Sequence, residues 1–253
     1  MKKFASALVI FLLSSVAIAQ RADYKVSILP ATGGNFTLVV ISPDGAIQRM
    51  TGYNSDSRNL ETAATWGRKL ELALNSGAVQ WADVTNHLLG RLVADAPRNG
   101  YAEPSTEKAF QVLQAQAITG YRVSIMPASG RDFRLAVLGP EGFTSQLGYN
   151  SDSENIKFAA TWGRKLETAL NRGVLKRRDF DEHLLRRFVS GAYIHETTVR
   201  TYGIVKAQII SGYTVDIAPG SEGDFRLLIV GHKALRLIWA GTPIQLQTLI
   251  ELC

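Results

Sequence analysis

The sequence predicts an α+β protein made of tandem repeats of a small three-stranded antiparallel sheet covered by two helices, with the third repeat incomplete. Three observations lead to this fold class: short stretches in which apolar and polar residues alternate, longer stretches with apolar residues at helical spacing, and the recurrence of both along the chain. The composition agrees with it, because 46% apolar and 20% charged residues among 253 are typical of a globular protein and not of a disordered or fibrous one.

Internal repetition is the most informative feature of the chain. The stretch YKVSILPATGGNFTLVVISPDG begins at Tyr24, and YRVSIMPASGRDFRLAVLGPEG begins 97 residues later at Tyr121. The offset falls to 96 between Trp66 and Trp162, so one residue is lost in the turn between these landmarks, where length changes are tolerated. A third stretch, YTVDIAPGSEGDFRLLIVG, begins at Tyr213 and then loses its resemblance to the others.

The repeats define the division of the chain that we expect. A repeat this small buries only about 60% of the surface of its unfolded chain, so neighbouring repeats are expected to pack on one another. The expected parts are a signal peptide (1–19), a first module (20–95), a linker and helix (96–119), a second module (120–190), and a linking helix with a truncated third module (191–253).

Each module has the same order of expected elements. In the first, Tyr24, Val26 and Ile28 alternate with polar residues, which is the period of a half-buried strand. The Gly33-Gly34 pair breaks this pattern before a second alternation begins. The expected strands lie near 24–28, 36–40 and 46–50, and the expected helices near 57–75 and 83–93.

The longer predicted helix has a buried face rich in small residues. Glycine at position 67 costs about 1 kcal/mol relative to alanine in a helix interior, which indicates close packing against the sheet. The residues at helical spacing are Leu60, Ala63, Ala64, Gly67, Leu70 and Leu74. An Asn-Ser-Gly sequence at 75–77 is expected to end this helix, and further helices are expected near 105–118 and 199–210.

Residues 1–19 have the three parts of a secretory signal peptide. Two lysines precede the apolar run Phe4–Leu13, and Ala17-Ile18-Ala19 has the spacing of a cleavage site. We therefore expect a periplasmic or secreted protein. Retention as a membrane anchor is the alternative, but the run is shorter than the roughly 20 residues that span a bilayer, and no later segment is apolar enough to cross one.

Charge and cysteine content exclude several classes of protein. The net charge of +6 and the pI near 9.5 favour anionic partners in general, without a specific signal for nucleic acid. The single cysteine, Cys253, excludes an intramolecular disulfide and a Cys-rich metal framework. No G-x-S-x-G elbow, Walker sequence or dinucleotide fingerprint is present, so we expect neither catalysis nor a cofactor.

Two peptides are identical in the first and second modules. GYNSDS, at 52–57 and 148–153, stands where the chain enters the long helix. An anion could bind the free N–H groups of that helix N-terminus, or a serine or aspartate of the peptide could cap them. Capping is favoured, because Asp56 would repel an anion.

The second identical peptide is AATWGRKLE, at 63–71 and 159–167. Its tryptophan and basic residues could form a patch for a sugar, a phosphate or a polyanion. Alternatively, the tryptophan lies at the edge of the buried helix face and the charges are solvated. The candidate binding residues from both peptides are Tyr53, Trp66, Arg68 and Lys69, with Tyr149, Trp162, Arg164 and Lys165 at the matching positions.

Two Asp/His pairs are candidate metal ligands. His87 follows Asp83 by four residues and His183 follows Asp179 by four, so on a helix each pair would share a face. Neither pair has a third ligand at short spacing, whereas a catalytic zinc ion has three. The competing interpretation is that each aspartate caps the second helix of its module.

These observations favour an exported, non-enzymatic repeat protein that binds another envelope or extracellular macromolecule, either a protein or an anionic polymer. One alternative is a periplasmic hydrolase or metal-dependent enzyme that uses the Asp/His pairs. Another is an anion-binding module that uses the arginines and lysines of AATWGRKLE. No cofactor is expected in the leading hypothesis.

Overall fold

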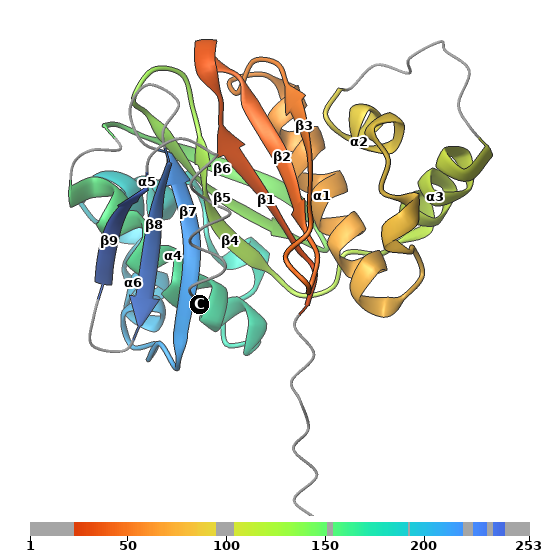
Figure 1. The fold of residues 1–253 in the computed structure, drawn as a ribbon. Helices are drawn as coiled ribbons and strands as arrows, with labels where there is room; N and C mark the ends of the chain where they lie inside the picture. The colour runs from red at the N-terminus through yellow and green to blue at the C-terminus, as the bar shows by residue number, and fades with distance from the viewer. Residues whose placement is uncertain are drawn as a thin grey trace, which may run out of the picture.

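The structure, a computed structural model, contains nine strands and six α-helices in its described residues (Figure 1). This confirms the α+β content. The expected signal peptide, the second copy of the Ser-Asp-Ser sequence and Cys253 lie outside the described residues. The described ranges are 23–94, 104–150, 154–191, 193–219, 225–231 and 235–240.

The strands form three antiparallel sheets, each made of three consecutive strands. The first sheet consists of β1 (Lys25–Pro30), β2 (Phe36–Ile41) and β3 (Ile47–Gly52). The second consists of β4 (Arg122–Pro127), β5 (Phe133–Gly139) and β6 (Gly142–Gly148), and the third of β7 (Tyr213–Pro219), β8 (Phe225–Gly231) and β9 (Leu235–Ala240).

The sequence loses its resemblance to the earlier modules after Gly231, and the described residues there include a third strand, β9, which pairs with β8. The third sheet therefore has the same strand order as the first two. Backbone hydrogen bonds pair the strands of a sheet, so this pairing does not require the side-chain pattern of the other modules.

The strand registers of the first two sheets correspond closely. The middle strand of each pairs a phenylalanine with the last glycine of the third strand, Phe36 with Gly52 and Phe133 with Gly148. The ring lies directly over the glycine, because a Cβ atom would come within 2.2 Å of it at Gly52 and 2.4 Å at Gly148. The glycine that begins each GYNSDS peptide is therefore required by packing.

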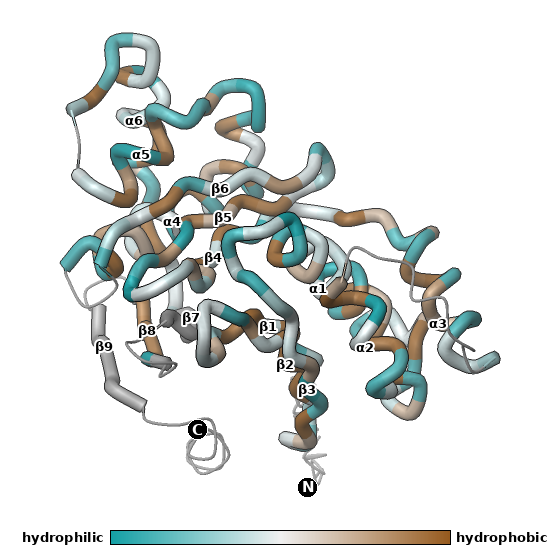
Figure 2. The backbone as a smooth tube through the Cα atoms, turned by 90° about the horizontal axis from the view of Figure 1, so that it is seen from above, coloured by the Kyte–Doolittle hydropathy of each residue, from teal (hydrophilic) through white to brown (hydrophobic). Residues whose placement is uncertain are grey.

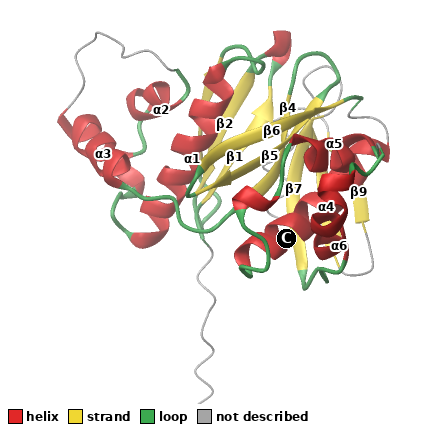
Figure 3. Cartoon of the chain, turned by 180° about the vertical axis from the view of Figure 1, so that it is seen from behind, coloured by secondary structure: helices red, strands yellow, loops and turns green. Residues whose placement is uncertain are grey.

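Some helices lie against the sheets and others pack on those helices, as the view from behind shows (Figure 3). In the first half of the chain they are α1 (Arg58–Ser76), α2 (Asn86–Leu92) and α3 (Pro104–Ala115), and in the second half α4 (Glu154–Asn171), α5 (Glu182–Ser190) and α6 (Val199–Lys206). The predicted apolar face of α1 is buried, and Gly77 ends this helix with left-handed backbone angles. None of these helices is long and apolar enough to cross a membrane, within the residues described.

The second helix of the first module begins later than the sequence predicts. Residues Trp81–Asp83 form a 3-10 turn, and the N-cap of α2 is Thr85, whose hydroxyl accepts the N–H of Leu88 (3.2 Å). The expected cap, Asp83, instead accepts the N–H of Gln80 (3.1 Å). An aspartate that bonds to a nearby backbone N–H stabilises a turn as readily as a helix start, which is why spacing alone misplaced the cap.

The spacing of the sequence also misplaces the helix cap in the second module. Asp181, not Asp179, caps α5 and accepts the N–H of Leu184 (3.1 Å). Asp179 closes its own 3-10 turn by accepting the N–H of Lys176 (2.8 Å).

The core consists of two apolar clusters, each of which crosses a boundary between modules. The first lies between the first sheet and helices α1 to α3, and it includes Met126 and Ala136 from the second sheet. The other lies between the second sheet and helices α4 to α6, and it includes Leu228 and Val230 from β8. Apolar segments along β5 and β8 are visible in Figure 2. The second sheet thus packs the face turned away from α4, here called its rear face, against the first module. The third sheet packs the matching face of β8 against the second module, and this face is called its rear face as well.

Candidate functional site

Tyr53 lies in a loop between β3 and α1 that hydrogen bonds hold in place. Asn54 has left-handed backbone angles (φ 61°), and its N–H donates to Oδ1 of Asn35 (3.1 Å). Ser55 is fully buried and donates both its N–H and its hydroxyl to the carbonyl oxygen of Gly34 (2.9 Å each). These contacts tie the loop to the turn that precedes β2.

The same loop forms the start of α1. The hydroxyl of Ser57 accepts the N–H of Asn59 (3.2 Å), so the capping interpretation of GYNSDS is confirmed at this serine. The side-chain amide of Asn59 returns to the carbonyl oxygen of Tyr53 (3.0 Å). The backbone around Tyr53 is therefore held by hydrogen bonds in which the tyrosine ring takes no part.

Tyr149 is held in the same way in the second module. Asn150 again has left-handed angles (φ 59°), and its N–H donates to Oδ1 of Asp132 (3.0 Å). Asn155 donates its side-chain amide to the carbonyl oxygen of Tyr149 (3.3 Å). The acceptor here is the carboxylate of Asp132 where the first module has the side-chain amide of Asn35, and the asparagine that follows each tyrosine has left-handed angles in both modules.

Both tyrosine rings are exposed to solvent, by 65% at Tyr53 and 62% at Tyr149. The loops are held by other groups, so folding does not require these rings. An aromatic ring on a rigid backbone loses little conformational entropy when it binds, and its face and hydroxyl offer apolar and polar contacts together. The two loops are the best candidates for a binding site in the described part of the chain.

A hollow of about 230 Å³ lies beside the first loop, between the start of α1 and the rear face of the second sheet. Its charged lining residues are Asp56, Arg58, Glu61 and Arg134, and Phe143 and Ser145 of β6 line it as well. Arg134 pairs with Asp56 (Nη2 to Oδ1, 3.0 Å). Hydrogen bonds from Ser129, together with this arginine, hold the pKa of the Asp56 carboxyl below its ordinary value.

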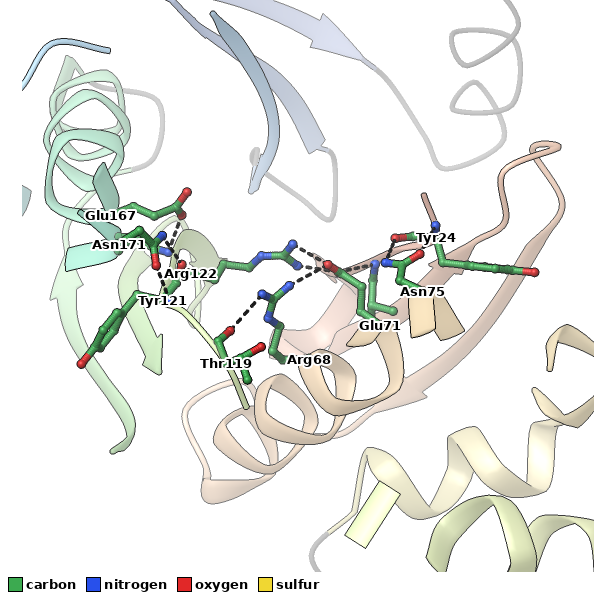
Figure 4. A network of polar contacts seen from close by, with 11 residues as sticks. Tyr24, Arg68, Glu71, Asn75, Thr119, Tyr121, Arg122, Glu167 and Asn171 are labelled. Carbon is green, nitrogen blue, oxygen red and sulfur yellow. Dashed lines mark hydrogen bonds and ion pairs between the residues drawn. The ribbon is translucent and has the colours of Figure 1, made fainter. Parts of the chain in front are cut away.

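The AATWGRKLE peptide supplies the polar centre of the junction between the first two modules (Figure 4). Glu71, only 3% exposed, accepts Nη1 of Arg68 (2.8 Å), the N–H of Val26 (3.0 Å), and both terminal nitrogens of Arg122 (2.5 and 2.6 Å). Burial and the neighbouring Arg122 lower the pKa of the Arg68 guanidinium. Arg68 also contacts the carbonyl oxygen of Thr119 (3.4 Å), so it serves the fold.

The second copy of the peptide has a related arrangement. Glu167 accepts the N–H of Val123 (2.8 Å) and forms an ion pair with Arg164. Beside these networks, one asparagine in each module clamps the backbone before the first strand. Asn75 bonds to the N–H and carbonyl of Tyr24, and Asn171 does the same at Tyr121 (2.7 to 3.1 Å).

The two tryptophans pack against aromatic residues. Trp66 lies 4.9 Å from the ring of Phe110, and Trp162 packs against Phe188 (5.0 Å) and Tyr202 (4.7 Å), whose own ring centroids are 6.4 Å apart. They join α1 to α3 and α4 to α6 within the two apolar clusters. A packing role accounts for both residues.

The lysines of the peptide have internal partners too. Nζ of Lys69 donates to the carbonyl oxygen of Gln114 (3.1 Å), and Nζ of Lys165 donates to that of Lys206 (2.8 Å). In both cases the acceptor is a residue of the neighbouring helix, α3 or α6. The lysine and arginine pairs therefore contact neighbouring parts of the fold in both modules, while the lysines stay partly exposed.

The Asp/His pairs are not on shared helix faces. Asp83 and Asp179 belong to the 3-10 turns, whereas His87 and His183 lie in the first turns of α2 and α5. His183 is exposed and stacks on His195 (ring centroids 4.7 Å apart). No group of three or more His, Cys, Asp or Glu residues that could hold a metal ion occurs in the described ranges.

Sequence reasoning overlooked Glu71, Arg122 and Arg134 as junction residues. Glu71 is the last residue of the AATWGRKLE peptide and lies on the buried face of α1. A charged residue at a buried position needs a partner, so this position was the signal in the sequence for an ion pair. The partner across the junction, Arg122, comes from the second sheet, and no local sequence pattern identifies it.

No protein-family model, curated protein or solved structure matches this sequence. The function is therefore inferred from the residues of the chain itself.

Proposed function

We propose that this chain is an exported, non-enzymatic repeat protein that binds another envelope or extracellular macromolecule through the loops of Tyr53 and Tyr149. The observation that carries this proposal is the presence of two exposed tyrosines at matching positions, Tyr53 and Tyr149. Each is followed by an asparagine with left-handed backbone angles, and the side chain of a second asparagine, Asn59 or Asn155, donates to the carbonyl oxygen of the tyrosine. Export rests on the signal-peptide pattern of residues 1–19.

Tandem repetition of one unit is part of this proposal. The matching registers of the sheets, the paired tyrosine loops and the paired asparagine clamps support a shared origin for the first two modules. The third module joins the second by presenting the rear face of β8, as the second sheet does toward the first module. Its three-stranded sheet makes it a further, divergent copy in this proposal.

The contacts of the basic residues argue against the anion-binding alternative. Arg68 and Arg164 are bound to glutamates, and Lys69 and Lys165 donate to carbonyl oxygens of neighbouring helices. A site for an anionic polymer would need cations free to meet it. The metal-dependent alternative gains no support from Asp83 or Asp179, because turns occupy their carboxylates.

Affinity capture tests the proposed function. The chain lacking residues 1–19 is immobilised and incubated with solubilised envelope and extracellular fractions, with and without a crosslinker, beside the double variant Tyr53→Ala, Tyr149→Ala. We expect the double variant to lose the captured component while keeping its thermal stability.

Tyr193→Ala is the matched control, because Tyr193 is 88% exposed but lies outside the two loops. It should capture as the unaltered chain does. Equal capture by the double variant and the unaltered chain would refute the role of the loops, and turnover of a cell-wall or phosphoester substrate would refute the non-enzymatic assignment.

A further inference from the structure

We propose that the turn between α4 and α5 binds the surface of a membrane that contains anionic phospholipids. The site consists of three cationic side chains around one exposed valine, and it is called here the basic turn. Its residues are Arg172, Val174, Lys176 and Arg178. It lies outside the loops of Tyr53 and Tyr149, so this inference goes beyond the proposed function.

The backbone of the basic turn has the same hydrogen bonds as the turn that follows α1 in the first module. The glycine after each long helix has left-handed angles, φ 68° at Gly173 and 78° at Gly77, and its N–H donates to the carbonyl oxygen three residues earlier (3.0 and 3.1 Å). The N–H of Lys176 donates to the carboxylate of Asp179 (2.8 Å), and that of Gln80 donates to the matching aspartate (3.1 Å). The first turn is therefore an internal reference for the second.

The exposed positions of the two turns carry different side chains. Within the basic turn, Leu175 is buried and the guanidinium of Arg177 lies over the ring of Phe180 (4.6 Å), so these residues serve the fold. The four exposed residues are Arg172, Val174, Lys176 and Arg178, and the exposed residues at the matching positions of the first turn are Ser76, Ala78, Gln80 and Ala82. The first turn forms without charge at these positions, so folding does not account for the three cations of the second.

The region around the basic turn is more positive than its counterpart. Residues 172–187 include six basic and three acidic residues, a formal charge of +3. The matching residues 76–91 include one basic and one acidic residue, a formal charge of zero. Like charges in one turn repel each other, which weakens the folded state and gives folding no reason to gather them here.

The acidic residues beside the basic turn bind backbone groups. Asp179 and Asp181 each accept a backbone N–H (2.8 and 3.1 Å), within the turn and at the start of α5. The side chain of Arg178 is 78% exposed and comes no closer than 3.9 Å to the carboxylate of Asp179. Arg172 and Lys176 are exposed as well. The three cations can therefore meet an anionic partner without giving up a close ion pair.

The exposed valine favours a membrane surface over a dissolved anionic polymer. Val174 is 52% exposed and stands between Arg172 and Lys176 in the sequence. Each Lys or Arg near an anionic membrane strengthens binding about fivefold. An apolar side chain beside these cations leaves water when it enters the boundary between headgroups and acyl chains. A dissolved polyanion would meet the cations and leave the valine in water.

Flotation with lipid vesicles tests this inference. The chain lacking residues 1–19 is mixed with vesicles of phosphatidylcholine alone, or of phosphatidylcholine with about 30% phosphatidylglycerol, and heparin serves as a dissolved polyanion. We expect binding to the anionic vesicles and none to the neutral ones. The affinity should fall at least about fivefold between 0.1 and 0.5 M salt, because salt screens exposed charges.

The first module supplies the substitutions for the basic turn. The triple variant Arg172→Ser, Lys176→Gln, Arg178→Ala carries the side chains of the first turn, so it should keep its thermal stability and bind anionic vesicles about 100-fold more weakly. Val174→Ala should weaken vesicle binding about threefold and leave any binding of heparin unchanged.

A second triple variant controls for net charge. It removes three exposed cations of the first module through the substitutions Lys25→Gln, Arg49→Gln and Lys108→Gln. It should bind anionic vesicles within about twofold of the unaltered chain, because charges far from the contact are screened.

Three results would overturn the inference. Equal weakening by the two triple variants would show that net charge alone attracts the membrane. Equal binding to neutral and anionic vesicles would remove the role of the cations. Binding to heparin that depends on the basic turn, without binding to anionic vesicles, would identify a dissolved polyanion as the partner. Both tyrosines are unchanged in these variants, so none of these results bears on the proposed function.

Discussion

Arg122, the first residue of β4, contacts Glu71 of α1 through both of its terminal nitrogens, at 2.5 and 2.6 Å. The same carboxylate accepts Arg68 from its own helix and the backbone N–H of Val26 from β1. One buried side chain thus joins α1, the first sheet and the second sheet. A carboxylate taken out of water is stabilised only where several donors surround it, as they do here.

Removing this carboxylate should loosen the junction of the modules. Glu71→Ala removes the carboxylate that two arginines and one backbone N–H share, and we expect a loss of about 3 kcal/mol in the free energy of unfolding. Urea denaturation followed by circular dichroism measures it. Lys25 occupies the position that matches Arg122 and is exposed, so Lys25→Ala should change stability by less than about 0.5 kcal/mol. Equal effects of the two substitutions would contradict the role of Glu71.

Two glycine substitutions should change stability in opposite directions. A methyl group at Gly148 would lie 2.4 Å from the fully buried ring of Phe133, and we expect Gly148→Ala to destabilise the protein by about 2 kcal/mol. Gly203, inside α6, has open space around the same position, so Gly203→Ala should stabilise by about 0.5–1 kcal/mol. Thermal denaturation of the two variants checks both signs, and a stabilised Gly148→Ala variant would contradict the described packing.

Trp162 should matter for stability and not for binding. Its ring packs against both Phe188 and Tyr202, so Trp162→Ala removes contacts with two aromatic rings and should cost about 3 kcal/mol. Near-ultraviolet circular dichroism and the denaturation midpoint measure this loss. Lys165→Ala should leave capture of the macromolecule unchanged. A stable Trp162→Ala variant with impaired capture would restore the aromatic and basic patch as the binding site.

The ion pair of Asp56 with Arg134 should weaken in acid. The pKa of Asp56 in the folded state lies below its ordinary value of 3.8, because Ser129 and Arg134 stabilise the carboxylate. The stabilisation is therefore present above pH 3.8 and is lost as the pH falls through the folded-state pKa. In a double-mutant cycle of Asp56→Asn and Arg134→Met, we expect a coupling of about 0.5 kcal/mol at pH 7, because both side chains are partly exposed.

That coupling should disappear as the carboxyl is protonated, and it should decrease in 0.5 M salt. Urea denaturation of the four proteins at several pH values gives the measurement. A coupling energy that increases as the pH falls would show that Arg134 does not stabilise the ionised form of Asp56.

The local elements could be predicted because their causes are local. Alternation at Tyr24, Val26 and Ile28 located the first strand, and the small residues around Gly67 located the buried face of α1. The errors were local as well. Asp83 and Asp179 have the right spacing for helix caps, but an aspartate bonds equally well to the N–H groups of a 3-10 turn.

By itself the sequence determined the α+β class, the approximate positions of the three strands of the first module, the apolar face of the first long helix and the paired tyrosines. Tertiary structure alone decided that the rear face of each following sheet packs on the preceding module, which brings Arg122 to Glu71 across 51 residues. It also decided that the arginines and lysines of AATWGRKLE serve the fold while the tyrosines stay exposed. The physical reason is that periodicity records which side of an element is buried, whereas the partner of a charged group depends on how whole elements dock.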